Sequence, residues 1–291
     1  MNSISQTRGK TSDAKNSHYA KLRRNYRDRK NLGHNNGTTK IIQNQISSQE
    51  NKLLLYGIHT VRAALNNPKR QIFQLIATRN AIANLNCNED LPHTFPIKIV
   101  LPREIEKIVG KDNSHQGVVL ETKPLSYPEL DTIQKSQLII VLDQVNDPHN
   151  VGAILRSAVA FKCGAIITTK RHSPNESAVL AKSASGALEH IPYIRIGNLS
   201  DALQKIHSFG FQTIGLSSES NTSLEETLQH NKIALILGSE GKGLRQKTAT
   251  IVNSTANLNI PGPIKSLNVS NASAIALYIT QNHLKAQSFL T

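Results

Sequence analysis

The chain has no tryptophan and only 4% aromatic residues among its 291 residues, which is ordinary for an α/β protein. Its two cysteines, Cys87 and Cys163, are far apart. This argues against a disulfide scaffold and a Cys-x-x-Cys metal site, and fits a reducing, cytoplasmic setting. No stretch approaches the roughly 18 continuous apolar residues of a membrane span, and residues 1–40 lack the apolar core of a secretory signal. His, Asp and Cys residues show no metal-ligand spacing, so we predict no metal.

Basic residues, by contrast, are abundant and unevenly placed. The chain carries 34 Lys and Arg against 20 Asp and Glu, a net charge of +14. Residues 1–48 hold ten of the basic residues and only two acidic ones. An excess of this kind indicates a polyanionic partner, most often a nucleic acid, although it also serves solubility.

The first 48 residues are rich in Asn, Ser, Lys and Arg and poor in large apolar side chains, so we predict a disordered basic tail over residues 1–48. Within it Arg23, Arg24 and Arg27 surround a tyrosine that can stack on a base, and these arginines are candidate RNA contacts. An organelle transit peptide is the competing interpretation. Such a peptide should be amphipathic and free of acids, whereas this segment has two aspartates and no apolar face.

Beyond the tail, apolar segments and turn signals predict two α/β domains. Residues 50–123 read as helix, strand, strand, helix and strand, a small accessory domain, and the proline-containing polar residues 124–137 read as a linker. Residues 138–291 alternate near-continuous apolar strands with helices, which indicates a parallel sheet covered on both faces. The expected strands are 72–77, 97–100, 118–122, 138–142, 165–168, 213–216, 233–237 and 257–260, and the expected helices are 56–65, 102–109, 151–161, 176–188, 199–208 and 269–285.

Three polar motifs each follow an apolar strand of the second domain, where an open α/β sheet builds its ligand crevice. The first motif is Asp147-Pro-His-Asn150-Val-Gly152-Ala-Ile-Leu-Arg156-Ser-Ala. Its glycine lets a ligand or another backbone approach the start of a helix, and Arg156 falls two helical turns in. Taken singly, Asp147 and Asn150 need be no more than helix caps, and Arg156 no more than a surface cation.

The second motif is Leu237-Gly238-Ser-Glu240-Gly-Lys-Gly-Leu244. It is neither a Walker A sequence nor a Gly-x-Gly-x-x-Gly turn. We interpret it as a flexible turn that offers backbone N–H and C=O groups to an adenine or ribose and holds one carboxylate, Glu240. The alternative for Glu240 is an acidic residue favoured by a helix dipole.

The third motif, Ile260-Pro-Gly-Pro-Ile-Lys-Ser266-Leu267-Asn268-Val-Ser270-Asn271-Ala, is a polar turn followed by a helix of small residues. Asn268 and the two polar residues at 270 and 271 are natural helix N-caps. An ordinary capped helix would explain the sequence from Ala272 onward, but not Ser-Leu-Asn-Val-Ser.

In this order the three motifs resemble the signature of the SpoU (TrmH-type) branch of the SPOUT RNA 2′-O-ribose methyltransferases, over about residues 53–285. Ser114-His115-Gln116-Gly117 is similar to the motif that closes the accessory domain of that family. The resemblance implies a parallel sheet whose chain is threaded into a deep trefoil knot, a small RNA-binding α/β domain in which His115 and Gln116 contact RNA, and a homodimer with its site at the interface. It also implies S-adenosylmethionine bound in the knot by Gly238, Ile260, Leu267, Ser266 and Asn268.

The reaction implied by the resemblance is attack of a ribose 2′-hydroxyl on the methylsulfonium of that cofactor. The electrophile is already activated, so the protein must position the reactants and handle one poorly acidic proton. The resemblance assigns the proton to Arg156, although orienting a neighbouring phosphate suits a guanidinium equally well. Glu240 would fix this arginine or the nucleoside. The candidate catalytic residues are Asn150, Arg156, Glu240, Ser266 and Asn268.

The accessory domain makes the chain similar to the large-subunit (23S-type) rRNA guanosine enzymes, which implies a role in ribosome maturation. Two alternatives stay open: a tRNA ribose 2′-O-methyltransferase, and a non-catalytic RNA-binding assembly factor of the same fold. The sequence also departs from the family pattern, because the segment between Ile260 and Gly262 is shorter than usual and is followed by an unusual Pro263 and Lys265. This departure alters the loop over the expected cofactor.

Overall fold

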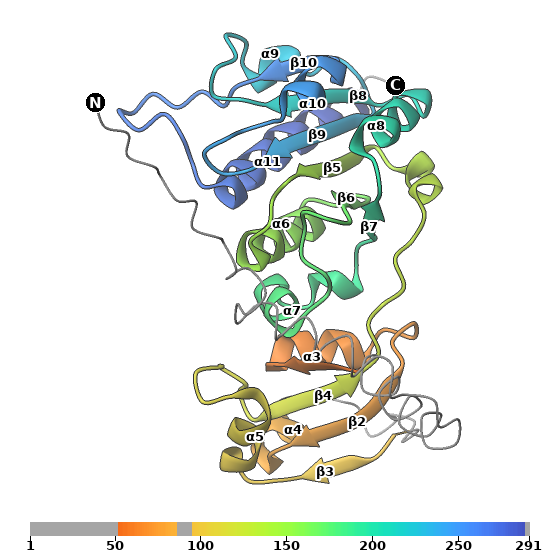
Figure 1. The fold of residues 1–291 in the computed structure, drawn as a ribbon, viewed down its shortest axis with the longest axis vertical. Coiled ribbons are helices and arrows are strands. Elements are labelled where there is room, and N and C mark those ends of the chain that lie inside the picture. Colours follow the sequence, from red (N-terminus) through yellow and green to blue (C-terminus); the bar gives the residue numbers. More distant parts are fainter. Residues whose placement is uncertain (1–51, 86–94, 289–291) are drawn as a thin grey trace, which may run out of the picture. The chain divides into compact units, whose positions relative to one another are not determined.

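The computed structural model describes residues 52–85 and 95–288, so the candidate tail residues Arg23, Arg24 and Arg27 lie outside the described residues. The described part of the chain contains two sheets, one of four strands and one of six (Figure 1). Within these two stretches no helix is both long and apolar enough to span a bilayer.

The four-stranded sheet belongs to the accessory domain. Its elements are β1 (Leu53–Tyr56), α3 (Ile58–Leu65), β2 (Ile72–Ala77), α4 (Arg79–Asn84), β3 (Ile97–Ile99), α5 (Pro102–Val109) and β4 (Val118–Thr122). The strand order is β1-β4-β2-β3, with β4 antiparallel to both of its neighbours and β3 parallel to β2. Apolar side chains of α3 and α4 pack against one face of this sheet, and those of α5 against the other. The sequence does not predict β1 and α4, which are short.

The six-stranded sheet is parallel throughout, in the order β10-β8-β9-β5-β6-β7. Its central strand β5 is buried in all six residues, as expected for a strand covered on both faces. The strand β7, which begins directly after Pro192, is not among the expected strands. The strands are β5 (Leu138–Asp143), β6 (Ile166–Thr169), β7 (Tyr193–Ile196), β8 (Gln212–Leu216), β9 (Ile233–Gly238) and β10 (Ser254–Ala256).

Helices cover both faces of this sheet. Leu138, Ile140 and Leu142 of β5 join the apolar cluster under α6, α7, α9 and α11, whereas Ile139 and Val141 join the cluster under α8 and α10. Strand alternation therefore produces a three-layer domain. The elements are η1 (Leu130–Lys135), α6 (Pro148–Ala160), α7 (Ala178–Ala184), η2 (Ala187–Glu189), α8 (Leu199–Ser208), α9 (Leu224–Thr227), α10 (Gln246–Ile251) and α11 (Val269–Ser288).

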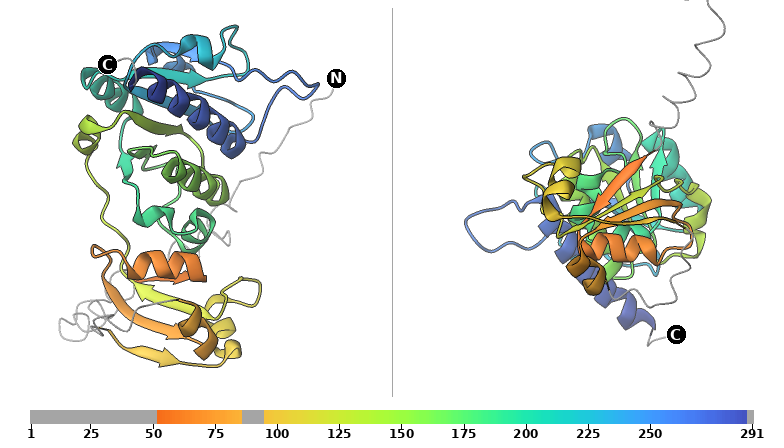
Figure 2. Two further views of the ribbon diagram at one scale, coloured as in Figure 1. Left: turned by 180° about the vertical axis from the view of Figure 1, so that it is seen from behind. Right: turned by 90° about the horizontal axis from the view of Figure 1, so that it is seen from below.

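Two expected elements differ from the structure. The expected strand 257–260 is wrong: β10 ends at Ala256, and Asn257 keeps only an isolated bridge to Ser223 while its amide donates to the Ser220 carbonyl. The expected helix 176–188 is interrupted, because Ser185 and Gly186 both have positive φ and end α7 at Ala184. Residues 257–268 instead form a long excursion from the end of β10 to the start of α11 (Figure 2).

Candidate functional site

A crevice of about 830 Å³ lies at the carboxyl ends of β8, β9 and β10. Its walls are the last residues of these strands, the turn after β9 and the excursion before α11. The apolar part of the lining includes Leu216, Leu237, Leu258 and Ile260. Six candidate residues from the second and third motifs line it: Gly238, Glu240, Ile260, Ser266, Leu267 and Asn268. The expected position of the crevice in an open parallel sheet is therefore the position observed.

The turn after β9 is a tight hairpin. The Ser239 N–H donates to the Gly243 carbonyl at 3.1 Å, and the Gly243 N–H donates back to the Ser239 carbonyl at 2.9 Å. A Cβ on Gly238 would overlap the backbone of Gly243 and Leu244, so only glycine fits there. Glu240 is thereby presented at the tip of a short loop that is anchored to a buried strand.

The three motifs meet at the carboxylate of Glu240. Its Oε1 accepts a hydrogen bond from Asn150 Nδ2 at 3.0 Å and another from Asn268 Nδ2 at 2.6 Å. Asn268 Nδ2 also donates to Asn150 Oδ1 at 3.0 Å. Segments that are 90 and 118 residues apart in sequence from Asn150 thus converge on one oxygen.

The orientation of the Asn268 amide follows from the start of α11. Its Oδ1 accepts from the backbone N–H of Ser270 at 2.9 Å, as an N-cap does, so its Nδ2 must face Glu240. Asn268 is therefore both a cap and a contact of the carboxylate. Asn150 is not a cap, because the cap of α6 is Asp147, whose side chain accepts from the His149 N–H.

This arrangement leaves Glu240 Oε2 without a hydrogen bond from the described part of the chain, and Glu240 is exposed to the crevice. Two amides hold one carboxylate oxygen, and the other is left without such a partner. Such a group can accept a hydroxyl proton or a hydrogen bond from a ligand, and its orientation is set before the ligand arrives.

Asp143 is a residue of the site that the sequence reasoning missed. It ends β5, is fully buried, and accepts from Arg245 Nε at 2.7 Å and from the Arg245 backbone N–H at 3.2 Å. This pair fixes the far end of the second motif to the neighbouring strand. The signal in the sequence is an aspartate that closes an apolar strand, since a buried carboxylate requires partners.

The third-motif loop closes through Lys265, one of the two unusual residues. Its Nζ donates to the Ile260 carbonyl at 3.2 Å, across the loop. Ile264 and Leu267 are exposed, at 72% and 38%. The loop therefore holds its own shape with one side-chain contact and leaves two apolar side chains uncovered in this chain.

Arg156 does not join the other candidate catalytic residues. It lies on α6 and is exposed, and its side chain forms no ion pair or hydrogen bond with residues 52–85 or 95–288; Glu240 contacts the two asparagines instead. The expectation that Glu240 fixes Arg156 or the nucleoside therefore stays a prediction.

His115 and Gln116 lie at the accessory domain's closing turn, where Gln116 has φ of 54°. Gln116 Oε1 accepts from the Ile58 N–H and from Lys182 Nζ of α7, both at 3.0 Å. Next to Lys182 on α7, Ser183 Oγ shares a hydrogen bond of 3.1 Å with His149 Nδ1. A line of polar side chains therefore leads from the accessory domain to the first motif.

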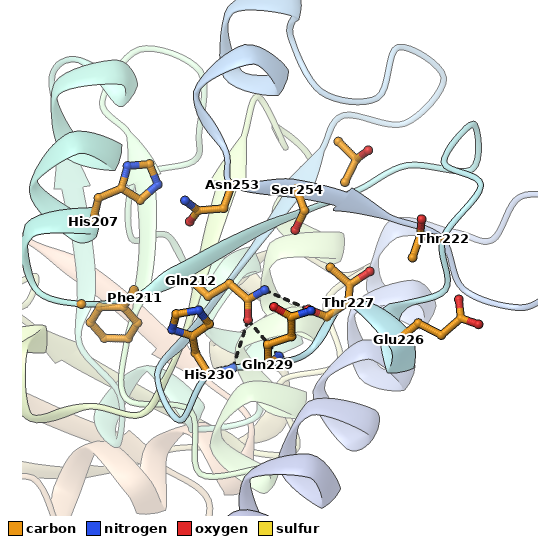
Figure 3. A pocket seen from close by; sticks show the side chains of 12 residues that line it. His207, Phe211, Gln212, Thr222, Glu226, Thr227, Gln229, His230, Asn253 and Ser254 are labelled. Carbon is orange, nitrogen blue, oxygen red and sulfur yellow. Dashed lines mark hydrogen bonds between the residues drawn. The ribbon is translucent and has the colours of Figure 1, made fainter.

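A second hollow, of about 520 Å³, lies at the amino ends of β8 and β10 (Figure 3). None of the candidate residues lines it. Across the described ranges, no three His, Cys, Asp or Glu side chains gather as metal ligands would.

Comparison with known proteins agrees with this geometry. The family described as the SpoU rRNA methylase family matches residues 137–278, and the family described as the substrate-binding domain of RNA 2′-O-ribose methyltransferases matches residues 54–128. A 23S rRNA (guanosine-2′-O-)-methyltransferase of Coxiella burnetii is 33% identical over 240 residues, which are 80% of this chain and 96% of the relative. The chain belongs to the SpoU rRNA methylase family.

Further SpoU relatives extend the comparison. A 23S rRNA (guanosine-2′-O-)-methyltransferase of Ralstonia nicotianae is 35% identical over 234 residues, 77% of this chain and 93% of the relative. The solved structure of an rRNA methyltransferase from Sinorhizobium meliloti with bound AdoMet superposes with a TM-score of 0.68 at 22% identity, covering 86% of this chain and 95% of that one. The structural likeness supports the fold of both domains.

Proposed function

We propose that this SpoU-family chain is an S-adenosylmethionine-dependent RNA methyltransferase that methylates the ribose 2′-hydroxyl of a guanosine in 23S-type rRNA during ribosome maturation. The observation that carries the proposal is the meeting of Asn150, Glu240 and Asn268, one residue from each motif, beside the crevice. The relatives in Coxiella and Ralstonia are named for this reaction.

The crevice fits the cofactor. Its volume of about 830 Å³ is within the range of small-molecule sites, and it is lined by both apolar and polar residues. The hairpin at Gly238 brings two backbone segments closer than any side chain allows, which suits a ligand held by main-chain groups. Gly238, Ile260 and Leu267 would hold S-adenosylmethionine, with Ser266 and Asn268 beside them. When bound, the cofactor supplies a methyl group on a positively charged sulfur.

The chain's own residues then position the ribose and receive its proton. Asn150 and Asn268 hold Oε1 of Glu240, so its Oε2 would be the group that accepts the proton of the ribose 2′-hydroxyl. Arg156 orients the neighbouring phosphate, because a guanidinium stays protonated and binds phosphate oxygens in a fixed geometry.

We propose that Arg156 reaches this phosphate from a second subunit, so the proposal includes a homodimer. Arg156 is exposed on α6, and Ile275 and Tyr278 on the neighbouring α11 are also exposed, at 42% and 56%. Uncovered apolar side chains beside an unpaired arginine suit an interface between copies. Within it, Arg156 of the partner subunit would complete the site. The deep trefoil knot implied by the family, built from the second and third motifs, belongs to the same proposal.

The remaining parts have proposed roles in RNA binding. Residues 50–123 form the domain that grips structured RNA, with His115 and Gln116 on its contact face; residues 124–137 are the linker, and residues 138–291 the methyltransferase domain. The basic residues 1–48 add salt-dependent affinity through phosphate contacts, with Arg23, Arg24 and Arg27 among them. The protein acts in the cytoplasm and requires no metal.

The test is methyl transfer from radiolabelled S-adenosylmethionine to fractionated RNA, with the wild type beside Arg156→Ala. An alkali-resistant labelled dinucleotide from large-subunit rRNA, absent with the variant, is the expected result. The variant should lose about 99% of turnover and keep its cofactor affinity, because only positioning is lost. Lys247→Ala, which removes an exposed charge from α10, serves as the matched control and should stay active.

Other outcomes of this assay point elsewhere. Label in tRNA would favour the tRNA enzyme, and cofactor binding without label in any fraction would favour a non-catalytic assembly factor. The homodimer has its own test: mixing Arg156→Ala with Glu240→Gln subunits should restore about a quarter of the sites, because half of a random mixture is heterodimers with one complete site each. No recovery would contradict the shared site.

A further inference from the structure

The accessory domain and the methyltransferase domain share a seam that the proposed reaction does not explain. Side chains of α3 pack on α7 and η2, and the two domains belong to one continuous apolar cluster. Gly186 lies in this seam with φ of 93°, and a Cβ there would come within 2.7 Å of Ala63 Cβ. The two domains therefore approach each other as closely as their backbones allow.

At one end of the seam is a buried ionic cluster of Arg70, Glu176 and Glu189. Their side chains are 0%, 3% and 2% exposed. Arg70 precedes β2 of the accessory domain. In the methyltransferase domain, Glu176 precedes α7 and Glu189 is the last residue of η2. Arg70 Nη2 lies 2.7 Å from Glu176 Oε1 and also bonds Glu189 Oε1, while its Nε donates to Glu189 Oε2 at 3.3 Å.

The segment that joins the domains is tied to the same cluster. Arg70 Nη1 donates to the Lys123 carbonyl at 3.1 Å, and Glu176 Oε2 accepts from the Leu125 N–H at 2.7 Å. The Glu176 N–H donates to the hydroxyl of Tyr127 at 3.3 Å. Three segments, two domains and their connection, are thus held by one guanidinium and two carboxylates.

The cluster carries more negative than positive charge in a buried place. Burial lowers the pKa of Arg70, but the hydrogen bonds and charges of Glu189 and Glu176 outweigh this, and its pKa lies above the ordinary value. A buried ionic cluster gains little stability over apolar side chains of the same volume. What it adds is a defined orientation of the groups it joins, because the planar guanidinium donates hydrogen bonds to carboxylates only in a fixed geometry.

The other end of the seam is close to the proposed RNA contacts. Lys182 Nζ of α7 donates to Gln116 Oε1, and burial lowers the pKa of Lys182. Thr60 Oγ1 donates to the Ala181 carbonyl at 3.2 Å. A rotation about the ionic cluster would therefore shift Gln116 relative to α7, and with it relative to the catalytic amides.

We infer that the Arg70–Glu176–Glu189 cluster locks the accessory domain at a fixed distance and angle from the crevice, and so selects which nucleotide of a structured RNA receives the methyl group. The three side chains are positioning residues for the target, remote from the reacting atoms. The inference rests on the proposed function where the methylated nucleotide is mapped. Where the protected RNA footprint is mapped, it rests on RNA binding alone.

The test uses full-length protein with the charges removed together: Arg70→Met, Glu176→Gln and Glu189→Gln in one variant. Removing all three leaves no unpaired buried charge, and glutamine keeps an acceptor for Asn67 and for the Leu125 N–H. A second variant, Gly186→Ala, separates the domains by sterics. Gly210→Ala is its matched control, because Gly210 also has positive φ (82°) but has no neighbour within 4 Å and lies away from the seam.

Three readouts are compared. Trypsin cleavage after Lys123 and Lys135 reports release of the linker, cofactor titration reports the integrity of the crevice, and mapping of the methylated nucleotide and the protected RNA footprint reports positioning. We expect faster linker cleavage, unchanged cofactor affinity, and a loss of about a hundredfold in kcat/KM at the wild-type nucleotide, since a misplacement of about 1 Å has that effect. Methylation or footprint should spread to neighbouring nucleotides. Gly210→Ala introduces the same kind of backbone strain away from the seam, and it should match the wild type in all three readouts.

Wild-type selectivity and footprint in both seam variants would overturn the inference, with or without faster linker cleavage. If the wild type binds RNA without transferring methyl groups, the proposed function fails and the footprint alone decides the lock. If the wild type binds no RNA, both fail.

Discussion

The two ends of the six-stranded sheet each carry a hollow, and the two hollows differ in what their polar side chains bind. At the carboxyl ends lies the crevice of about 830 Å³, and at the amino ends the hollow of about 520 Å³. Both are lined by polar side chains. In the amino-end hollow Gln212 donates to the Thr227 carbonyl at 2.8 Å and accepts from the N–H groups of Gln229 and His230 (Figure 3).

The polar groups of the amino-end hollow complete the chain's own backbone. The amide of Gln212 satisfies three main-chain groups between α9 and β9, and Asn253 bonds Thr213 in the same way across β8. At the carboxyl end, one side chain from the first motif and one from the third converge on one oxygen of Glu240, and its other oxygen has no hydrogen bond from the described residues. Convergence on an open group, rather than size or polarity, distinguishes the proposed functional crevice from the other hollow.

Substituting Gly238 by alanine should break the carboxyl end most severely. The new Cβ would overlap the backbone of Gly243 and Leu244, so the hairpin that presents Glu240 must open. We expect cofactor affinity, measured by calorimetry, to fall by about 4 kcal/mol, roughly 1,000-fold. Gly262→Ala is the matched control, because Gly262 lines the same loop region with nothing within 4 Å, and it should stay within twofold of wild type, about 0.4 kcal/mol. Retained affinity in Gly238→Ala would show that the hairpin does not bind the cofactor.

Glu240→Gln should spare cofactor binding and remove turnover. Glutamine keeps an oxygen for Asn150 and Asn268 but loses the charge that receives the hydroxyl proton. We expect kcat to fall about a hundredfold with the cofactor Kd nearly unchanged, as when one preorganised electrostatic contact is removed. Glu226→Gln is the comparison at the amino-end hollow, where glutamine can still accept from the Ser223 N–H, and its kcat should match wild type. Equal losses in both variants would erase the distinction between the two ends.

Much of the scaffold is predictable because continuous apolar segments indicate buried strands. The strands 138–142 and 233–237 are apolar in nearly every residue, and the structure has β5 and β9 there. The sequence pattern predicts a strand at 257–260 instead of β10. It misses β10 because the sequence Ser254-Thr-Ala256 carries no apolar signal. Its pairing with β8 is supplied by tertiary contact, which local pattern does not encode.

A residue's role in the candidate site is predictable from sequence only where its contacts are with residues close to it in the chain. Asn268 follows from capping preference, but its second role toward Glu240 depends on contacts between residues far apart in sequence. Asp143 was missed for the same reason, since its partner Arg245 is 102 residues away. The role of Arg156 stays a prediction, because its side chain forms no hydrogen bond or ion pair with the part of the chain that the structure describes.

Gln212→Ala should affect stability and leave function intact. It would deprive three main-chain groups of their partner, among them the buried Thr227 carbonyl, which costs about 1–3 kcal/mol of the free energy of unfolding. Urea denaturation measures this change, and kcat and cofactor Kd at a permissive temperature should equal wild type. Gln229→Ala is the control, because this exposed glutamine lines the same hollow, and it should leave stability unchanged. A selective loss of activity in Gln212→Ala would mean that the amino-end hollow takes part in the reaction.

Ser254→Ala should have the smallest effect, and it sharpens the comparison by testing a buried lining group that does not complete the backbone. Its Oγ is buried and has no hydrogen-bond partner among residues 52–85 and 95–288. Removing an unsatisfied buried hydroxyl should leave stability unchanged or raise it by up to about 1 kcal/mol. Ser223→Ala provides the contrast, because that hydroxyl accepts from the Glu226 N–H as the cap of α9, and its loss should cost about 1 kcal/mol. If Ser254→Ala destabilises as much as Ser223→Ala, its hydroxyl has a bound partner in solution, and the amino-end hollow is more than a structural one.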